Sequence, residues 1–124
     1  MTTSSKNISA PQVRTIRDSQ TTTIPVQTAT ASYVDLAGSK VDARNSSSVA
    51  FVLKNAHGSL TSKYKILASI DDVTYVEVQA EATLTAAGGT GGYVTTAPAY
   101  NYYKAQLIDG SGHGTLEGSV VTKD

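Results

Sequence analysis

The sequence predicts an all-β protein, an antiparallel β-sandwich of the immunoglobulin-like or jelly-roll-like kind with about 7–8 strands and an extended N-terminal arm. Apolar residues alternate with polar ones at a period of two, and turn residues interrupt these segments about every 8–12 residues. No window of a dozen residues shows a helical period. A chain of 124 residues that is 40% hydrophobic is long enough for one such domain.

The first 30 residues predict an arm, and residues 31–124 the sandwich domain. The arm is rich in Thr, Ser and Gln, and its few hydrophobic residues are isolated between polar ones. Its first three charged residues, Lys6, Arg14 and Arg17, are all basic, although the whole chain has ten basic and ten acidic residues. The arm therefore carries a local positive charge that the neutral total hides.

The strands predicted next follow from side-chain alternation. In "SVAFVLKN", residues 48–55, the apolar side chains of Val49, Phe51 and Leu53 share one face. The segment "NAHGS" then predicts a turn, and "KYKILASI" alternates again over residues 63–70. Asp71 and Asp72 predict the turn of a hairpin with "VTYVEVQA", residues 73–80.

The C-terminal third predicts one further short strand, a glycine-rich loop and a final pair of strands. "EATLTAA" is the short strand, and "GGTGG", residues 88–92, contains too much glycine for a regular element. "YNYYKAQLID" and "GTLEGSVVTK" form the final pair, joined by "GSGHG". Alternation assigns Tyr103 and Leu107 to the core and places Tyr100 and Tyr102 on an outer face beside Lys104.

The composition argues against several classes of function. A net charge of zero disfavours nucleic acid and anionic membranes as partners, and the absence of cysteine removes disulfides, thiolate metal sites and cysteine nucleophiles. His57 and His113 lie in predicted turns without the spacing of a metal site, and no serine lies in a nucleophile elbow. We therefore expect neither an enzyme nor a metal or cofactor site. The N-terminus has no signal-peptide core, so synthesis in a cytoplasm is expected.

The outward tyrosines, Tyr100 and Tyr102, allow three interpretations. Such a pair can stack on a sugar or base, cover a neighbouring strand, or anchor a protein interface, where tyrosine is enriched. The residues alone leave these three open.

One segment resembles a known group of proteins. "SIDDVTYVEV", residues 69–78, is similar to a hairpin of small β-sandwich virion proteins of tailed bacteriophages and of discoidin-like carbohydrate-binding modules. In this sequence, as in those proteins, a glycine-rich loop and a tyrosine-rich strand follow the hairpin. Asp71-Asp72 stands where an Asp-Gly turn is usual, and Tyr75 where Trp is usual. The small, cysteine-free, charge-balanced chain with its Thr/Ser-rich arm is most similar to head decoration proteins, also called capsid auxiliary or cement proteins.

This resemblance implies a structural virion protein that binds the outer surface of an assembled phage capsid and stabilises it. Its partner would be the major capsid protein, its location the capsid surface, and its state a homo-oligomer, often a trimer. We expect residues 13–26 to make the contact by adding to an exposed strand edge. Ile16, Ile24 and Val26 would be the apolar anchors, and Arg14 and Arg17 would meet acidic shell residues.

Two alternatives belong to other classes of function. A carbohydrate-binding adhesion module on the virion would use Tyr100 and Tyr102, and it requires both rings to be exposed beside a groove. A tail or head-tail connector component would differ in copy number, which is high for a shell protein and low for a connector.

Overall fold

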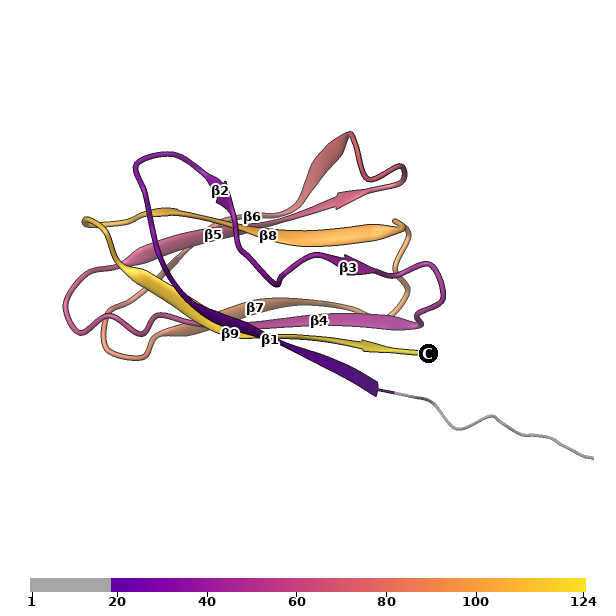
Figure 1. Cartoon of the computed structure of the whole chain (residues 1–124), viewed down its shortest axis with the longest axis horizontal. Helices are drawn as coiled ribbons and strands as arrows, with labels where there is room; N and C mark the ends of the chain where they lie inside the picture. Colours follow the sequence, from indigo (N-terminus) through magenta and orange to yellow (C-terminus); the bar gives the residue numbers. More distant parts are fainter. Residues whose placement is uncertain (1–18) are drawn as a thin grey trace, which may run out of the picture.

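The computed structural model describes residues 19–124, and the elements it assigns there are all β-strands (Figure 1). Two of the strands are short bridges of two residues, and the others have six to ten residues. In chain order they are β1 (Ser19–Thr28), β2 (Val34–Asp35), β3 (Val41–Asp42), β4 (Ser48–Lys54), β5 (Ser62–Ser69), β6 (Tyr75–Leu84), β7 (Thr90–Thr95), β8 (Tyr102–Asp109) and β9 (Thr115–Lys123). The predicted all-β class is confirmed.

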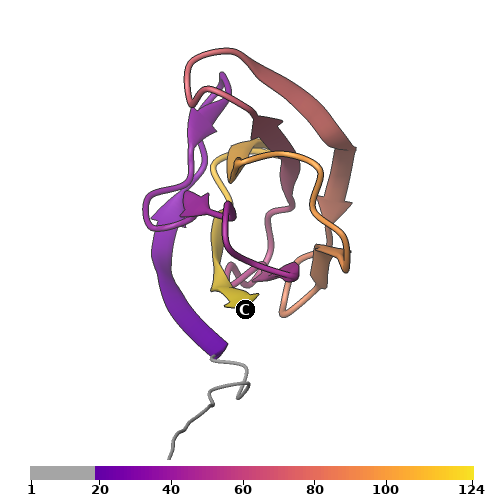
Figure 2. The same ribbon diagram turned by 90° about the vertical axis from the view of Figure 1, so that its right-hand side faces the viewer.

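The strands form two antiparallel sheets that face each other. Sheet I has the order β1-β9-β4-β7. Sheet II has the order β2-β8-β5-β6, and β3 also pairs with β8. Seen from the end, the first three strands lie on one side of the sandwich, and β6 and β7 lie on the other (Figure 2). Sheet I therefore has β1 and β7 as its edges, and sheet II has β6 and the β2–β3 segment.

The core confirms the predicted alternation in the three central strands. Val49, Phe51 and Leu53 of β4 are buried, and they face buried side chains of β5 and β8. Tyr103 is also buried, as predicted, and its ring packs on that of Tyr93 with the centroids 6.2 Å apart. Period two therefore identified the inward face wherever a strand is covered on that side by the other sheet.

The sandwich begins earlier than the predicted boundary at residue 31. Residues 19–28 form β1, which pairs with β9 from Ser19 opposite Lys123 to Thr28 opposite Thr115. The strand was not recognised because it is an edge strand with nearly all its side chains in solvent, so little of its sequence is apolar. Pro25 lies where the register shifts between Ile24 and Gln27, a position that an edge strand tolerates.

The glycine-rich segment at residues 88–92 is a loop only in its first half. Thr90–Thr95 forms β7, which pairs with β4 from Val49 opposite Thr95 to Lys54 opposite Thr90. Glycine is required here because the neighbours leave no space. A Cβ on Gly91 would lie 2.8 Å from the Leu84 side chain, and one on Gly92 would lie 2.0 Å from the carbonyl oxygen of Phe51. The glycines thus mark close packing rather than a break.

Candidate interaction surfaces

The interface residues predicted in the N-terminal arm do not share one environment. Arg14, Ile16 and Arg17 lie outside the described residues. Ile24 is only 1% exposed and belongs to the core of its own domain, whereas Val26 is 56% exposed on β1. The burial of Ile24 follows from its position in β1, where its side chain faces sheet II, so it does not extend toward a partner.

Tyr100 and Tyr102 do not form one stripe. β8 begins at Tyr102, so the alternation assumed from residue 100 does not hold, and the Tyr100 ring packs edge-on against Tyr103 at 6.3 Å between centroids. Tyr102 lies on the outer face of sheet II, and the Arg44 guanidinium lies over its ring at 5.5 Å from the centroid. A sugar that needs two bare neighbouring rings would not find them here.

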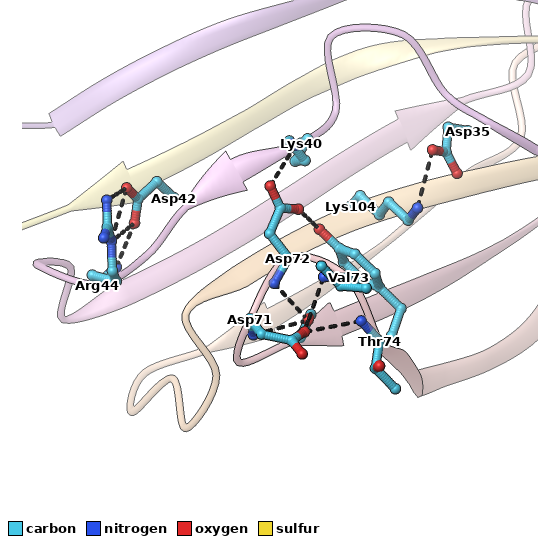
Figure 3. Close-up of polar contacts among 11 residues, drawn as sticks. Asp35, Lys40, Asp42, Arg44, Asp71, Asp72, Val73, Thr74 and Lys104 are labelled. Atoms are coloured by element: carbon cyan, nitrogen blue, oxygen red, sulfur yellow. Dashed lines mark hydrogen bonds and ion pairs between the residues drawn. The ribbon is translucent and has the colours of Figure 1, made fainter.

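On the outer face of sheet II, tyrosine side chains contact ion-paired lysines and carboxylates. Lys104 donates to the Asp35 carboxylate at 3.0 Å, and its Nζ lies 4.2 Å from the centre of the Tyr75 ring. The Tyr75 hydroxyl donates to Asp72, which also accepts from Lys40 at 2.8 Å. Figure 3 shows the polar contacts around Asp72 and between Lys104 and Asp35. One continuous set of contacts therefore joins the β2–β3 segment, β8 and the start of β6.

A second set of contacts occupies the same face further along the sheet. The Lys65 Nζ lies 4.0 Å from the centre of the Tyr33 ring, and the Tyr33 hydroxyl donates to Glu81. Burial, followed by the hydrogen bond to Glu81, raises the pKa of Tyr33 well above its usual value. For Tyr75, burial and the hydrogen bond to Asp72 raise the pKa in the same way. Both phenols therefore remain neutral donors at any physiological pH.

The Asp71–Asp72 turn is confirmed as a turn. The Asp71 carboxylate accepts from the backbone N–H groups of Val73 and Thr74 at 2.9 Å each, and it also accepts from the Ser69 hydroxyl (Figure 3). These bonds, those of Thr74 and Val73 first, lower the pKa of Asp71. The two carboxylates bind different groups and do not converge. Within residues 19–124, no cluster of His, Asp or Glu could hold a metal ion.

The outer face of sheet I is different, because two adjacent cross-strand rows on it contain no charged residue. The first row joins Val94 of β7, Ala50 of β4, Val121 of β9 and Thr21 of β1. The second row joins, in the same order of strands, Gly92, Val52, Ser119 and Thr23. We call these eight residues the uncharged face.

The uncharged face is exposed and bounded by charges. Val52 is 54% exposed and Val94 is 65% exposed. The next row toward one end contains Lys54 opposite Glu117, and the next row toward the other end contains Lys123. This surface was not predicted from the sequence, although the alternation of β4 already placed Ala50, Val52 and Lys54 on the side opposite the core.

Neither edge strand of sheet I carries a charge. β1 and β7 contain no Lys, Arg, Asp or Glu, whereas β6 contains Glu77 and Glu81. Charged side chains on an edge strand are a common defence against pairing with another chain. None of the described residues forms a helix long and apolar enough to cross a membrane.

Comparison with known proteins identifies the fold but no family. No protein-family model matches the sequence, and no curated protein matches it. A solved structure of the SPBc2 prophage-derived protein YomS superimposes with a TM-score of 0.54 and 11% identity, covering 90% of this chain and 98% of that one. A structure of Bacillus endospore appendages, described as a family of disulfide-linked pili, superimposes with a TM-score of 0.52 and 14% identity. The match covers 87% of this chain and 85% of that one.

A chain of infectious bursal disease virus, Gx strain, is also similar. The TM-score is 0.51 and the identity 18%, over 89% of this chain but only 32% of the viral one. At these identities the likeness concerns the fold alone. The sandwich described here is thus an architecture found in a prophage-derived protein, a pilus-forming appendage and a virus.

Proposed function

We propose that this protein is a structural component of a phage particle that binds the outer surface of the assembled capsid and stabilises it. The observation that carries the proposal is the uncharged face of sheet I, where Val52 and Val94 are more than half exposed. Exposed apolar side chains that lie together and are bounded by charges are typical of a protein-protein contact. The prophage and viral origin of two proteins with the same fold supports the setting.

The proposed partner is the major capsid protein, and the mechanism is thermodynamic linkage. A protein that binds the assembled lattice but not its separated subunits shifts the equilibrium toward the lattice. The face suits this role because it lies on rigid sheet and its two rows cross all four strands of sheet I. Little conformational entropy is lost when such a surface docks.

The outer face of sheet II is less suited to the same contact. Several of its lysines and carboxylates are already paired, as in the pairs Lys104–Asp35 and Lys40–Asp72. Docking on this side would have to replace those contacts or cover them. The chain contains no cysteine, so its contacts cannot be disulfide-linked as the endospore pili are described to be.

The test adds the purified full chain to capsids of the encoding phage that have been stripped of accessory proteins. Bound protein is measured by co-sedimentation, and shell stability by the temperature at which the capsids release DNA. The variant Val52→Lys with Val94→Lys should bind at least about a hundredfold more weakly, because it buries two unpaired charges in the contact.

The matched control adds two lysines on the edge strands of sheet II, by Val34→Lys and Ala80→Lys. Both positions are exposed, so the net charge changes equally while the uncharged face stays intact. The control should bind as the wild type does. Wild-type protein that fails to add back to capsids, or a sheet I variant that binds normally, would overturn the proposal.

A further inference from the structure

An apolar groove of about 280 Å³ lies at one end of the sandwich, beside the turn between β5 and β6. Its lining combines the end of β5, this turn, the start of β6 and the loop before β8. The lining residues are Ala68, Ser69, Ile70, Asp71, Thr74, Val76 and Tyr100. Ile70 is 66% exposed and the neighbouring Val73 is 81% exposed. This hairpin therefore presents large aliphatic side chains to solvent beside a hollow that can accept another one.

The walls of the groove are held in place by hydrogen bonds. The Asn101 side-chain amide donates to the carbonyl oxygen of Ile70 at 2.8 Å, and the Asn101 backbone N–H donates to that of Ser69 at 2.9 Å. The carboxylate of Asp71 organises the turn from inside, as described above. A preformed groove loses little entropy when an apolar group enters it.

β1 begins at this same end of the sandwich. Ser69 and Tyr102 pair at the end of sheet II, and Asp42 pairs with Tyr102 from the other side. The connection from β3 to β4 then leads to Ser47, whose backbone N–H donates to Lys123, the residue opposite Ser19. In Figure 1 the start of β1, the C-terminus and the turn after β5 lie at one end. Eighteen residues precede β1 in the sequence.

Residues 1–18 and residues 19–124 carry net charges of opposite sign. Residues 1–18 contain three basic and one acidic residue, a net charge of +2, which leaves seven basic and nine acidic residues, a net charge of −2, for residues 19–124. Ile16 is an aliphatic residue with Arg14 two residues before it and Arg17 directly after it. The groove is apolar, and its lining includes one charged residue, Asp71. An aliphatic side chain flanked by arginines fits such a groove.

The reach of the chain decides which copy supplies this segment. Ile16 is three residues from Ser19, so an extended chain carries it about 10 Å at most. β1 is one edge of sheet I, while the groove adjoins β6, the edge of sheet II on the opposite side of the sandwich. Three strand spacings and the gap between sheets separate them by roughly 17 Å. Ile16 therefore falls short of the groove of its own domain.

We propose that Ile16 of one copy inserts into the β5–β6 groove of a neighbouring copy, with Arg14 and Arg17 beside Asp71. The segment before β1 and the groove are different parts of the chain, so the contact is heterologous. Such contacts generate closed rings, or open chains if the rotation does not close. This association does not depend on the capsid, and it uses residues outside the uncharged face.

The experiment measures self-association of the full chain by sedimentation velocity over a range of concentrations. Ile16→Asp removes the anchor, and Ile70→Lys with Val73→Lys places positive charge, which repels Arg14 and Arg17, on the exposed rim of the groove. Each variant alone should associate about 10- to 100-fold more weakly than the wild type, the loss expected when one aliphatic side chain is no longer buried. High salt should weaken wild-type association because the flanking charges are exposed.

Mixing the two variants gives the sharpest result. The groove of the Ile16→Asp chain and residues 1–18 of the groove variant are both unchanged, so the mixture should form a heterodimer more strongly than either chain associates alone. Val34→Lys, at an exposed valine on β2 away from the groove, should associate as the wild type does. A wild-type chain that stays monomeric at every concentration, or variants that associate normally, would overturn the proposal. So would a mixture that forms no heterodimer.

Discussion

Replacing Gly92 by alanine should destabilise the domain by about 2–4 kcal/mol. A Cβ at this position would lie 2.0 Å from the carbonyl oxygen of Phe51 and 3.0 Å from its carbonyl carbon. Ordinary contact begins at 3.4 Å, so β7 would have to move away by more than an ångström. The obstacle is the backbone of β4, which cannot rotate aside as a side chain could. The shift would weaken one or two ladder hydrogen bonds, each worth about 1 kcal/mol, and the packing of Tyr93.

Urea unfolding followed by tyrosine fluorescence measures this loss, and a thermal scan should show a fall in Tm of roughly 10–20 °C. Gly58→Ala is the matched control, because a Cβ there would have no neighbour within 4 Å. The control should change the free energy of unfolding by no more than about 0.5 kcal/mol. A Gly92→Ala protein as stable as the control would refute the view that β7 needs glycine for close approach.

Three further predictions concern hydrogen bonds inside the domain. Tyr64→Phe removes the bond from the Tyr64 hydroxyl to the Gly92 carbonyl, 3.0 Å, and should cost about 1 kcal/mol in urea unfolding. Asn55→Ala should cost more, about 2–4 kcal/mol in the same assay, because the buried Asn55 amide donates to two backbone carbonyls that would lose their partner. The lowered pKa of Asp71 means that its stabilisation is complete above the unfolded value, about 3.9, and is lost as pH falls below it. Wild-type Tm should therefore fall more steeply than that of Asp71→Asn between about pH 4 and pH 2; parallel curves would contradict this.

Much of the sandwich could be predicted because its central strands are covered on one side. In β4, in residues 64–68 of β5 and in residues 103–107 of β8, the inward residues are apolar at every second position, so the pattern reports burial directly. The same logic located Tyr103 in the core. It failed for Tyr100 because alternation applies only within a strand, and β8 begins two residues later.

The edge strands could not be predicted for the opposite reason. β1 exposes nearly all its side chains and buries mainly Ile24, so it resembles a polar leader. In β7 glycine serves packing between strands, whereas in sequence it indicates a loop. The uncharged face depends on register, because Val94, Ala50, Val121 and Thr21 become neighbours only when four strands from distant parts of the chain align.

The all-β class, the inward faces of the central strands and the Asp71 turn follow from the sequence, since each depends on residues close together in the chain. The tertiary structure alone decided which surfaces are left for partners. Three surfaces form only when strands distant in the sequence come together. They are the paired charges and tyrosines of sheet II, the uncharged face of sheet I and the groove beside Tyr100. Local alternation shows that a side chain points outward, but only packing shows what lies beside it.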